Sequence, residues 1–149
     1  MTQNFVNPNN TQQRPDGKYN SVIADIQKAG VCPFCPEQLK NYHKNPILEE
    51  GPEWILTENM YPYKGAKHHL LLIHKKHIST IDEMSATAWS ELQELIKKAN
   101  KKFNITGGTF FARFGDTRFT GASVTHLHAH IVVSNPDDPE YSPLLTRIG

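Results

Sequence analysis

Three histidines alternate with apolar or small residues in the stretch THLHAHIVV, which covers residues 125–133. In a β-strand, successive side chains point to opposite faces, so His126, His128 and His130 share one face, with neighbours roughly 6.6 Å apart. The residues between them form an apolar face that must be covered by a core. A strand of this kind constrains the chain to a sheet with one imidazole face, which could bind a metal, perform catalysis or remain solvated.

The remaining hydrophobic pattern predicts the layers around this strand. Apolar residues recur at helical spacing after Ser85, a plausible N-cap, and predict a long helix over 86–103. A shorter helix is predicted near 19–30. Strands are predicted on both sides of a turn at Gly51-Pro52, over 68–78, over 107–116 and over 124–134. The fold class is therefore α+β: an antiparallel β-sheet of about five strands, with one long helix and a short N-terminal helix.

Length and charge limit the domain count and the partners. A chain of 149 residues suits one domain, expected over 19–149. Residues 1–18 are rich in Asn, Gln, Thr and Pro and predict a flexible arm. A net charge of +1 argues against nucleic acid as a partner. No apolar run approaches the roughly 20 residues that span a bilayer, and no secretory signal pattern begins the sequence, so we expect no membrane association and a cytoplasmic location.

The two cysteines, Cys32 and Cys35, form one Cys-x-x-Cys pair. This spacing is typical of half a tetrahedral zinc site, and two further ligands must come from elsewhere in the chain. Eight histidines are available, and His77 and His126 lie at the ends of two predicted strands. A thioredoxin-like redox pair is the alternative, but the flanking prolines and the missing preceding strand argue against it. The pattern favours a structural zinc ion, Zn²⁺.

A glycine-containing loop directly precedes the histidine strand. The stretch GDTRFTGAS carries Gly115 and Gly121, which let the backbone approach a ligand closely, and it ends in the hydroxyl donor Ser123. Backbone N–H groups in such a turn can bind an anion. An ordinary hairpin connection is the alternative. Beside three histidines, the phosphate-binding interpretation is the better one.

The combination of motifs resembles the histidine triad superfamily, in its zinc-containing bacterial-type branch. HLHAHIVV resembles the signature of three alternating histidines before apolar positions, and TGASV resembles the lead-in to it. The stretch HHLLLIHKKHI resembles the superfamily's strand that ends in Lys-x-His. TENMYPY resembles the segment before that strand, and CPFC resembles the zinc knuckle. The resemblance covers about residues 30–135.

This resemblance implies an enzyme that acts on a purine nucleotide or dinucleotide through a covalent nucleotidyl-histidine. His128 corresponds to the nucleophile, and His130 is expected to act beside it near the phosphate. The nucleotide-binding residues are expected to be Asn59 on the ribose, together with Gly121, Ser123 and His130. The zinc ligands are expected to be Cys32, Cys35, His77 and His126. The superfamily commonly forms homodimers, and a homodimer is expected here.

Two positions depart from the superfamily pattern. Ala122 replaces a glutamine that contacts phosphates in many hydrolytic members, and GAS is reminiscent of a uridylyltransferase branch. That branch, however, has glutamine where this chain has His130. His74 replaces a common proline.

Three functions therefore remain open. The first is a hydrolase or nucleotidyltransferase that cleaves the α-phosphoryl bond of a dinucleoside polyphosphate, a nucleoside phosphoramidate or an adenylylated conjugate. The others are a nucleotide-binding scaffold with little turnover and a uridylyltransferase-like enzyme.

Overall fold

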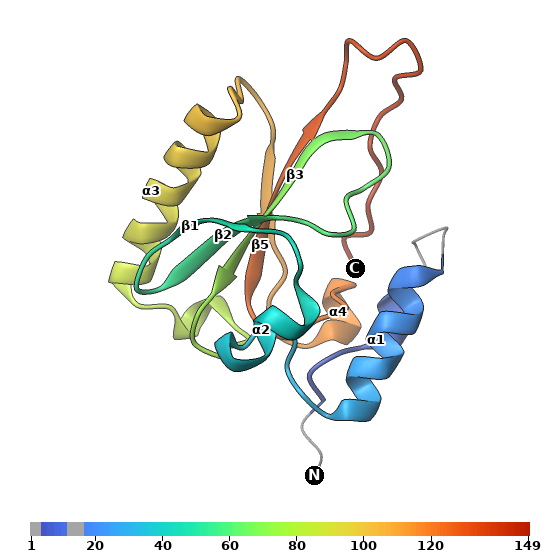
Figure 1. The fold of residues 1–149 in the computed structure, drawn as a ribbon, viewed down its shortest axis with the longest axis vertical. Coiled ribbons are helices and arrows are strands. Elements are labelled where there is room, and N and C mark those ends of the chain that lie inside the picture. Colours follow the sequence, from blue (N-terminus) through green and yellow to red (C-terminus); the bar gives the residue numbers. More distant parts are fainter. Residues whose placement is uncertain (1–3, 12–16) are drawn as a thin grey trace.

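The structure is a computed structural model that describes residues 4–11 and 17–149. Its five strands form one antiparallel sheet in the order β1-β2-β3-β5-β4, which confirms the predicted fold class. Figure 1 shows the long helix α3 on one side of this sheet and α1 on the other. The strands are β1 (Ile47–Glu50), β2 (Trp54–Glu58), β3 (Ala66–His74), β4 (Thr109–Ala112) and β5 (His128–Ser134), and the helices are η1 (Pro8–Thr11), α1 (Lys18–Ala29), α2 (Pro36–Tyr42), η2 (Ile81–Glu83), α3 (Ala86–Lys102) and α4 (Thr117–Thr120).

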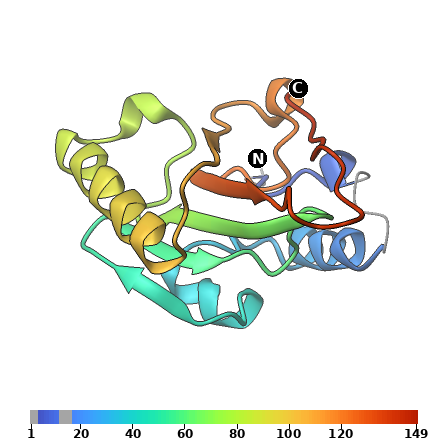
Figure 2. The same ribbon diagram turned by 90° about the horizontal axis from the view of Figure 1, so that it is seen from above.

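The two faces of the sheet carry different cores, as the alternation of side chains requires. On one face, Leu127, Ala129 and Ile131 pack with the buried side of α3, which supplies the core expected over this apolar face. The opposite face carries His128 and His130, and there Leu71 and Ile73 of β3 pack with Leu39 of α2. Figure 2 shows the ribbon from above, with α3 and α1 on opposite sides of the molecule. His128 and His130 therefore lie on the face away from α3.

The long helix α3 matches its predicted bounds within one residue. Ser85 is the N-cap, and its hydroxyl oxygen accepts a hydrogen bond from the Ala88 N–H at 3.0 Å. Lysines in the last turn suit the negative end of the helix dipole. The indole N–H of Trp54 donates to the carbonyl of Ala88 at 2.8 Å, which fixes the helix against β2. None of the helices in the described ranges is long and apolar enough to cross a membrane.

The N-terminal segment differs from the flexible arm predicted over 1–18 where the structure describes it. Residues 4–11 pack against the segment before β5: Val6 is 2% exposed and pairs with Val124, and the Thr125 N–H donates to the carbonyl of Phe5 at 3.0 Å. Phe5 and Val6 are the only large apolar residues in a polar stretch, and they anchor it. The prediction for residues 1–3 and 12–16 lies outside the described residues.

Strands β3, β4 and β5 do not fill their predicted ranges of 68–78, 107–116 and 124–134, and the structure adds the short helices α2 and α4. Strand β4 ends at Ala112, and the Asp116 carboxylate then accepts from the Arg118 N–H at 2.9 Å and caps the single-turn helix α4. Strand β5 begins at His128, four residues later than predicted. The predicted proline-fixed knuckle continues into α2 because Pro36 occupies the first helical turn, where a missing N–H costs nothing.

Candidate active site

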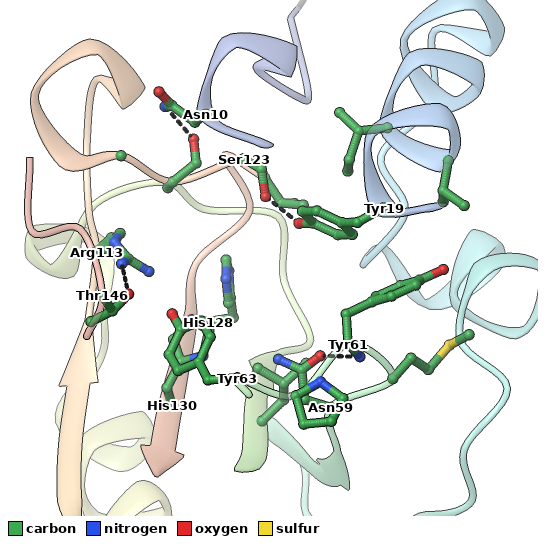
Figure 3. A pocket seen from close by; sticks show the side chains of 18 of the residues that line it. Asn10, Tyr19, Asn59, Tyr61, Tyr63, Arg113, Ser123, His128, His130 and Thr146 are labelled. Carbon is green, nitrogen blue, oxygen red and sulfur yellow. Dashed lines mark hydrogen bonds between the residues drawn. The ribbon is translucent and has the colours of Figure 1, made fainter. Parts of the chain in front are cut away.

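A pocket of about 700 Å³ opens on the histidine face of the sheet (Figure 3). Its walls come from α1, the β2–β3 loop, the α4–β5 loop, β5 and the C-terminal segment. One part is apolar, with Ile23 and Phe34 among its lining residues. Of the described residues that line it, Lys64 and Arg113 carry positive charge and none is a carboxylate. All five residues predicted to bind or attack a nucleotide line this pocket: Asn59, Gly121, Ser123, His128 and His130.

His128 presents an unprotonated nitrogen to this pocket. Its Nδ1 lies 2.7 Å from the carbonyl oxygen of His126, and because a carbonyl only accepts, Nδ1 carries the proton. The lone pair is therefore on Nε2. Burial lowers the pKa of His128 to about 4, and the positive charge of Arg113 acts in the same direction. The imidazole is consequently neutral at neutral pH, the state that a nucleophile requires.

His130 has the opposite tautomer, which is set by His69. The Tyr63 N–H donates to Nδ1 of His69 at 3.1 Å, so the proton of the neutral His69 ring lies on Nε2. That Nε2–H donates to Nδ1 of His130 at 2.9 Å, which leaves the His130 proton on Nε2. Both rings are buried, and Phe111 stacks on His130 with centroids 4.6 Å apart. Two imidazoles on one strand thus offer a lone pair and an N–H donor.

His69 is a residue that the sequence analysis missed. It lies on β3 opposite Val132, on the same face as His130, and is 4% exposed. The stretch HHLLLIH gives no alternating signal for it, because residues 70–73 are all apolar. The hydrogen bond to His130 joins residues 61 positions apart and depends on the register of β3 against β5.

The loop before β5 is held from three directions. Gly121 ends α4 with a φ of 68°, a left-handed conformation that favours glycine. The Ser123 hydroxyl makes a short hydrogen bond to the phenol of Tyr19 on α1. Asn10 donates its amide hydrogens to the carbonyls of Ala122 at 2.7 Å and Thr117 at 2.8 Å, as the N-terminal segment crosses the loop (Figure 3).

Asn59 lies at the opposite wall, in the β2–β3 loop. Its side-chain oxygen accepts from the Tyr61 N–H at 2.8 Å (Figure 3), and its amide nitrogen lies 3.1 Å from Nε2 of His69. Because Nε2 of His69 carries the proton that it donates to His130, only the Tyr61 contact is a hydrogen bond that fixes this side chain, which lines the pocket close to the His69–His130 pair.

The four predicted metal ligands lie together beside the pocket, with ligand atoms all within 4.8 Å of one another. Cys32 Sγ lies 3.3 Å from His126 Nδ1, Cys35 Sγ lies 3.3 Å from His77 Nδ1, and the two Nδ1 atoms are 3.1 Å apart. A tetrahedral zinc ion sets its nitrogen and sulfur ligands roughly 3.3–3.8 Å apart. The cluster therefore has nearly the dimensions that this ion requires.

Hydrogen bonding also orients one ligand of this cluster for a cation. Nε2 of His126 donates to the carbonyl of His74, so the lone pair of His126 lies on Nδ1, which faces the thiols. Burial lowers the pKa of His126 to about 4 and raises the pKa of Cys35 to about 12. A bound cation would stabilise the thiolate form of the cysteines and so lower their pKa. The donor set and its arrangement fit a closed structural zinc site.

The structure also accounts for His74, the residue that replaces a proline. Its ring packs edge-on against Trp54 with centroids 5.0 Å apart, and its Nδ1–H donates to the carbonyl of Lys76 at 2.9 Å. The side chain thus belongs to the core beneath α3, and only its carbonyl serves the metal cluster, through His126.

Sequence comparison gives one family match. The family model described as scavenger mRNA decapping enzyme C-term binding matches residues 31–140, which is most of the chain. No curated protein matches the sequence.

Several solved structures have a similar fold at low sequence identity. A hypothetical histidine triad nucleotide-binding protein from Sulfolobus tokodaii is 23% identical, with a TM-score of 0.57 over 78% of this chain and 79% of that one. A HIT family hydrolase from Clostridium thermocellum is 23% identical, with a TM-score of 0.51 over 68% and 90%. A zinc-bound histidine triad family protein from Mycobacterium smegmatis is 17% identical, with a TM-score of 0.50 over 68% and 73%.

Proposed function

We propose that this chain is a nucleotide hydrolase or nucleotidyltransferase. It belongs to the histidine triad superfamily, through the family described as scavenger mRNA decapping enzyme C-term binding. The reaction is cleavage of the α-phosphoryl bond of a purine nucleotide or dinucleotide, with transfer of the nucleotidyl group to His128. The observation that carries this proposal is the pair of opposite tautomers at His128 and His130.

The first step forms a bond between Nε2 of His128 and the α-phosphorus while the bond to the leaving group breaks. His128 supplies an available lone pair, and the carbonyl of His126 stabilises the cationic ring that results, by accepting from Nδ1. The Nε2–H of His130 donates to a phosphoryl oxygen, where negative charge develops. In the second step an acceptor such as water or phosphate attacks the phosphorus, and the bond to His128 breaks.

The remaining pocket residues bind the rest of the nucleotide in this proposal. Asn59 contacts the ribose hydroxyls, and Gly121 and Ser123 contact the phosphate from the loop before β5. The apolar part of the pocket receives the base, because a flat ring buries well against Ile23 and Phe34. The absence of carboxylates among the described lining residues favours an anionic ligand.

The Cys₂His₂ cluster is assigned a structural zinc ion, which is supported by the ligand spacing and by the orientation of the His126 ring. When bound, the ion cross-links the knuckle at Cys32 and Cys35 to the segments that carry His77 and His126. Four protein ligands leave no open position, so the ion has no direct part in the chemistry.

One experiment tests the assignment and separates the alternatives. The protein is incubated with dinucleoside polyphosphates, adenosine phosphoramidates, adenylylated conjugates and sugar nucleotides, with and without inorganic phosphate, and the products are identified. We expect turnover of at least one substrate and a mass increase of one nucleotidyl group on wild type but not on His128→Ala. Turnover by His128→Ala contradicts the mechanism. Tight binding of AMP without turnover of any substrate favours the scaffold alternative.

A further inference from the structure

Arg113 follows β4 at a position that faces the proposed nucleophile. In the β4–β5 register, Phe111 lies opposite His130 and Ala112 opposite Ala129. β4 ends at Ala112, and its register continued by one residue would place Arg113 opposite His128, on the same face of the sheet. The guanidinium carbon lies 5.0 Å from the ring centroid of Phe111, and Arg113 lines the pocket together with both histidines (Figure 3).

The guanidinium group is fixed at one nitrogen and retains donors at the others. Its Nη2 donates to the carbonyl of Arg147 and to the Thr146 hydroxyl, the latter at 3.3 Å. Nε is buried and has no partner among the described residues, and the same residues accept no hydrogen bond from Nη1. The buried Nε–H is unfavourable without an acceptor, and Nη1 remains able to donate to a ligand in the pocket that Arg113 lines.

The residues that fix Arg113 belong to the C-terminal strap, defined here as residues 143–149. The strap crosses the pocket, and Pro143, Leu145 and Thr146 contribute to its lining. Arg147 lies against the loop before β5: a Cβ at Gly121 would be 3.2 Å from its Cδ, and its Nη1 donates to Asn10 at 3.2 Å. Asn10 also holds the carbonyl of Ala122, so the strap and the loop before β5 share one support.

We propose that Arg113 binds the phosphoryl group that is transferred to His128, and that the C-terminal strap positions its guanidinium for this role. The proposal rests on the proposed function and adds a charged residue to its phosphate site. Phosphoryl oxygens are strong acceptors, and the planar guanidinium matches them better than an ammonium group does. The site therefore selects ligands with a negative phosphoryl group over the corresponding nucleosides.

Ligand affinity tests this role without any need for turnover. Dissociation constants for AMP and adenosine are measured by calorimetry for wild type, Arg113→Met, Arg113→Lys and Arg118→Met. Arg113→Met keeps an unbranched chain against Phe111. Arg118→Met is the matched control, because it removes the same charge from an exposed side chain that pairs with Asp116 and does not line the pocket.

Arg113→Met is expected to weaken AMP binding by roughly 10- to 100-fold while adenosine binding changes less than threefold. Arg113→Lys recovers part of the loss, and Arg118→Met binds as wild type does. Thr146→Val weakens AMP binding a few-fold in wild type but not in Arg113→Met, because the two residues act through one contact. Thermal unfolding checks that each variant is folded.

Two results overturn the proposal. One is an equal loss of AMP and adenosine affinity in Arg113→Met, which indicates a structural role. The other is unchanged AMP affinity in the folded variant. If AMP binding depends on Arg113 but no substrate is turned over, the phosphate-binding role stands and the proposed enzymatic function fails.

Discussion

Replacing His69 by phenylalanine tests whether the tautomer of His130 matters for the reaction. Phenylalanine has nearly the shape of histidine but cannot donate to Nδ1 of His130, a contact of 2.9 Å between two buried rings. The His130 ring then loses the partner that holds its proton on Nε2. The Tyr63 N–H, which donates to His69 at 3.1 Å, loses its acceptor in the same variant.

The structure sets the size of the expected effect. A buried polar atom left without its partner costs about 1–3 kcal/mol. If that cost falls on the transition state, kcat/KM decreases by about 5- to 150-fold. The unpaired N–H of Tyr63 lowers the free energy of unfolding by about 1–3 kcal/mol as well. His69→Gln is the matched control, because its amide nitrogen can donate in place of Nε2, and it is expected to retain most of the activity.

Two assays follow the two consequences separately. Steady-state kinetics on the best substrate of the panel reports kcat and KM, and urea unfolding reports stability. Nitrogen NMR of histidine-labelled protein reports which ring nitrogens carry protons, and we expect Nε2 of His130 and Nδ1 of His128 in wild type. A folded His69→Phe protein with kcat/KM within twofold of wild type would refute the reasoning, and so would a His130 ring protonated on Nδ1.

Three further substitutions test other parts of the structure. His128→Ala should abolish turnover and leave the melting temperature nearly unchanged, as measured by product analysis and thermal unfolding. Measurable turnover by this variant contradicts the proposal that His128 is the nucleophile. Cys32→Ala should bind no zinc in metal analysis, and its melting temperature should be roughly 5 °C or more lower. A loss of 1 kcal/mol in the free energy of unfolding lowers the melting temperature by about 2–4 °C. A zinc-free wild type contradicts the metal assignment. Glu91→Ala should lower the free energy of unfolding by about 1–3 kcal/mol in urea, because its carboxylate accepts from the N–H groups of Glu53 and Trp54; an unchanged value means that water replaces this contact.

The fold was predictable where a periodic pattern spans a whole element. The spacing of Leu92, Leu95 and Ala99 defines the buried side of α3, and the alternation after His126 assigns the two faces of β5. Single capping interactions were harder to foresee, because they depend on one hydrogen bond each. The Asp116 cap of α4, in a stretch where no helix was predicted, is the clearest example.

The site was predictable only as far as its residues belong to short motifs. The triad and the Cys-x-x-Cys pair indicate pocket and cluster residues, and the structure brings them together. His69 and Arg113 carry no such local signal, since their positions depend on the register of β5 with β3 and β4. The packing of Val6 beside Val124 is likewise a contact between distant parts of the chain.

The buried Nδ1 of His128 has a stereochemical consequence. With one ring nitrogen bound to the His126 carbonyl, only Nε2 is available to attack in the proposed mechanism. The leaving group and the incoming acceptor must therefore occupy the same side of the phosphorus, one after the other. Two successive in-line displacements return a chiral α-phosphorothioate to its original configuration. Catalysis in this pocket thus implies retention at phosphorus and departure of the first product before the acceptor enters.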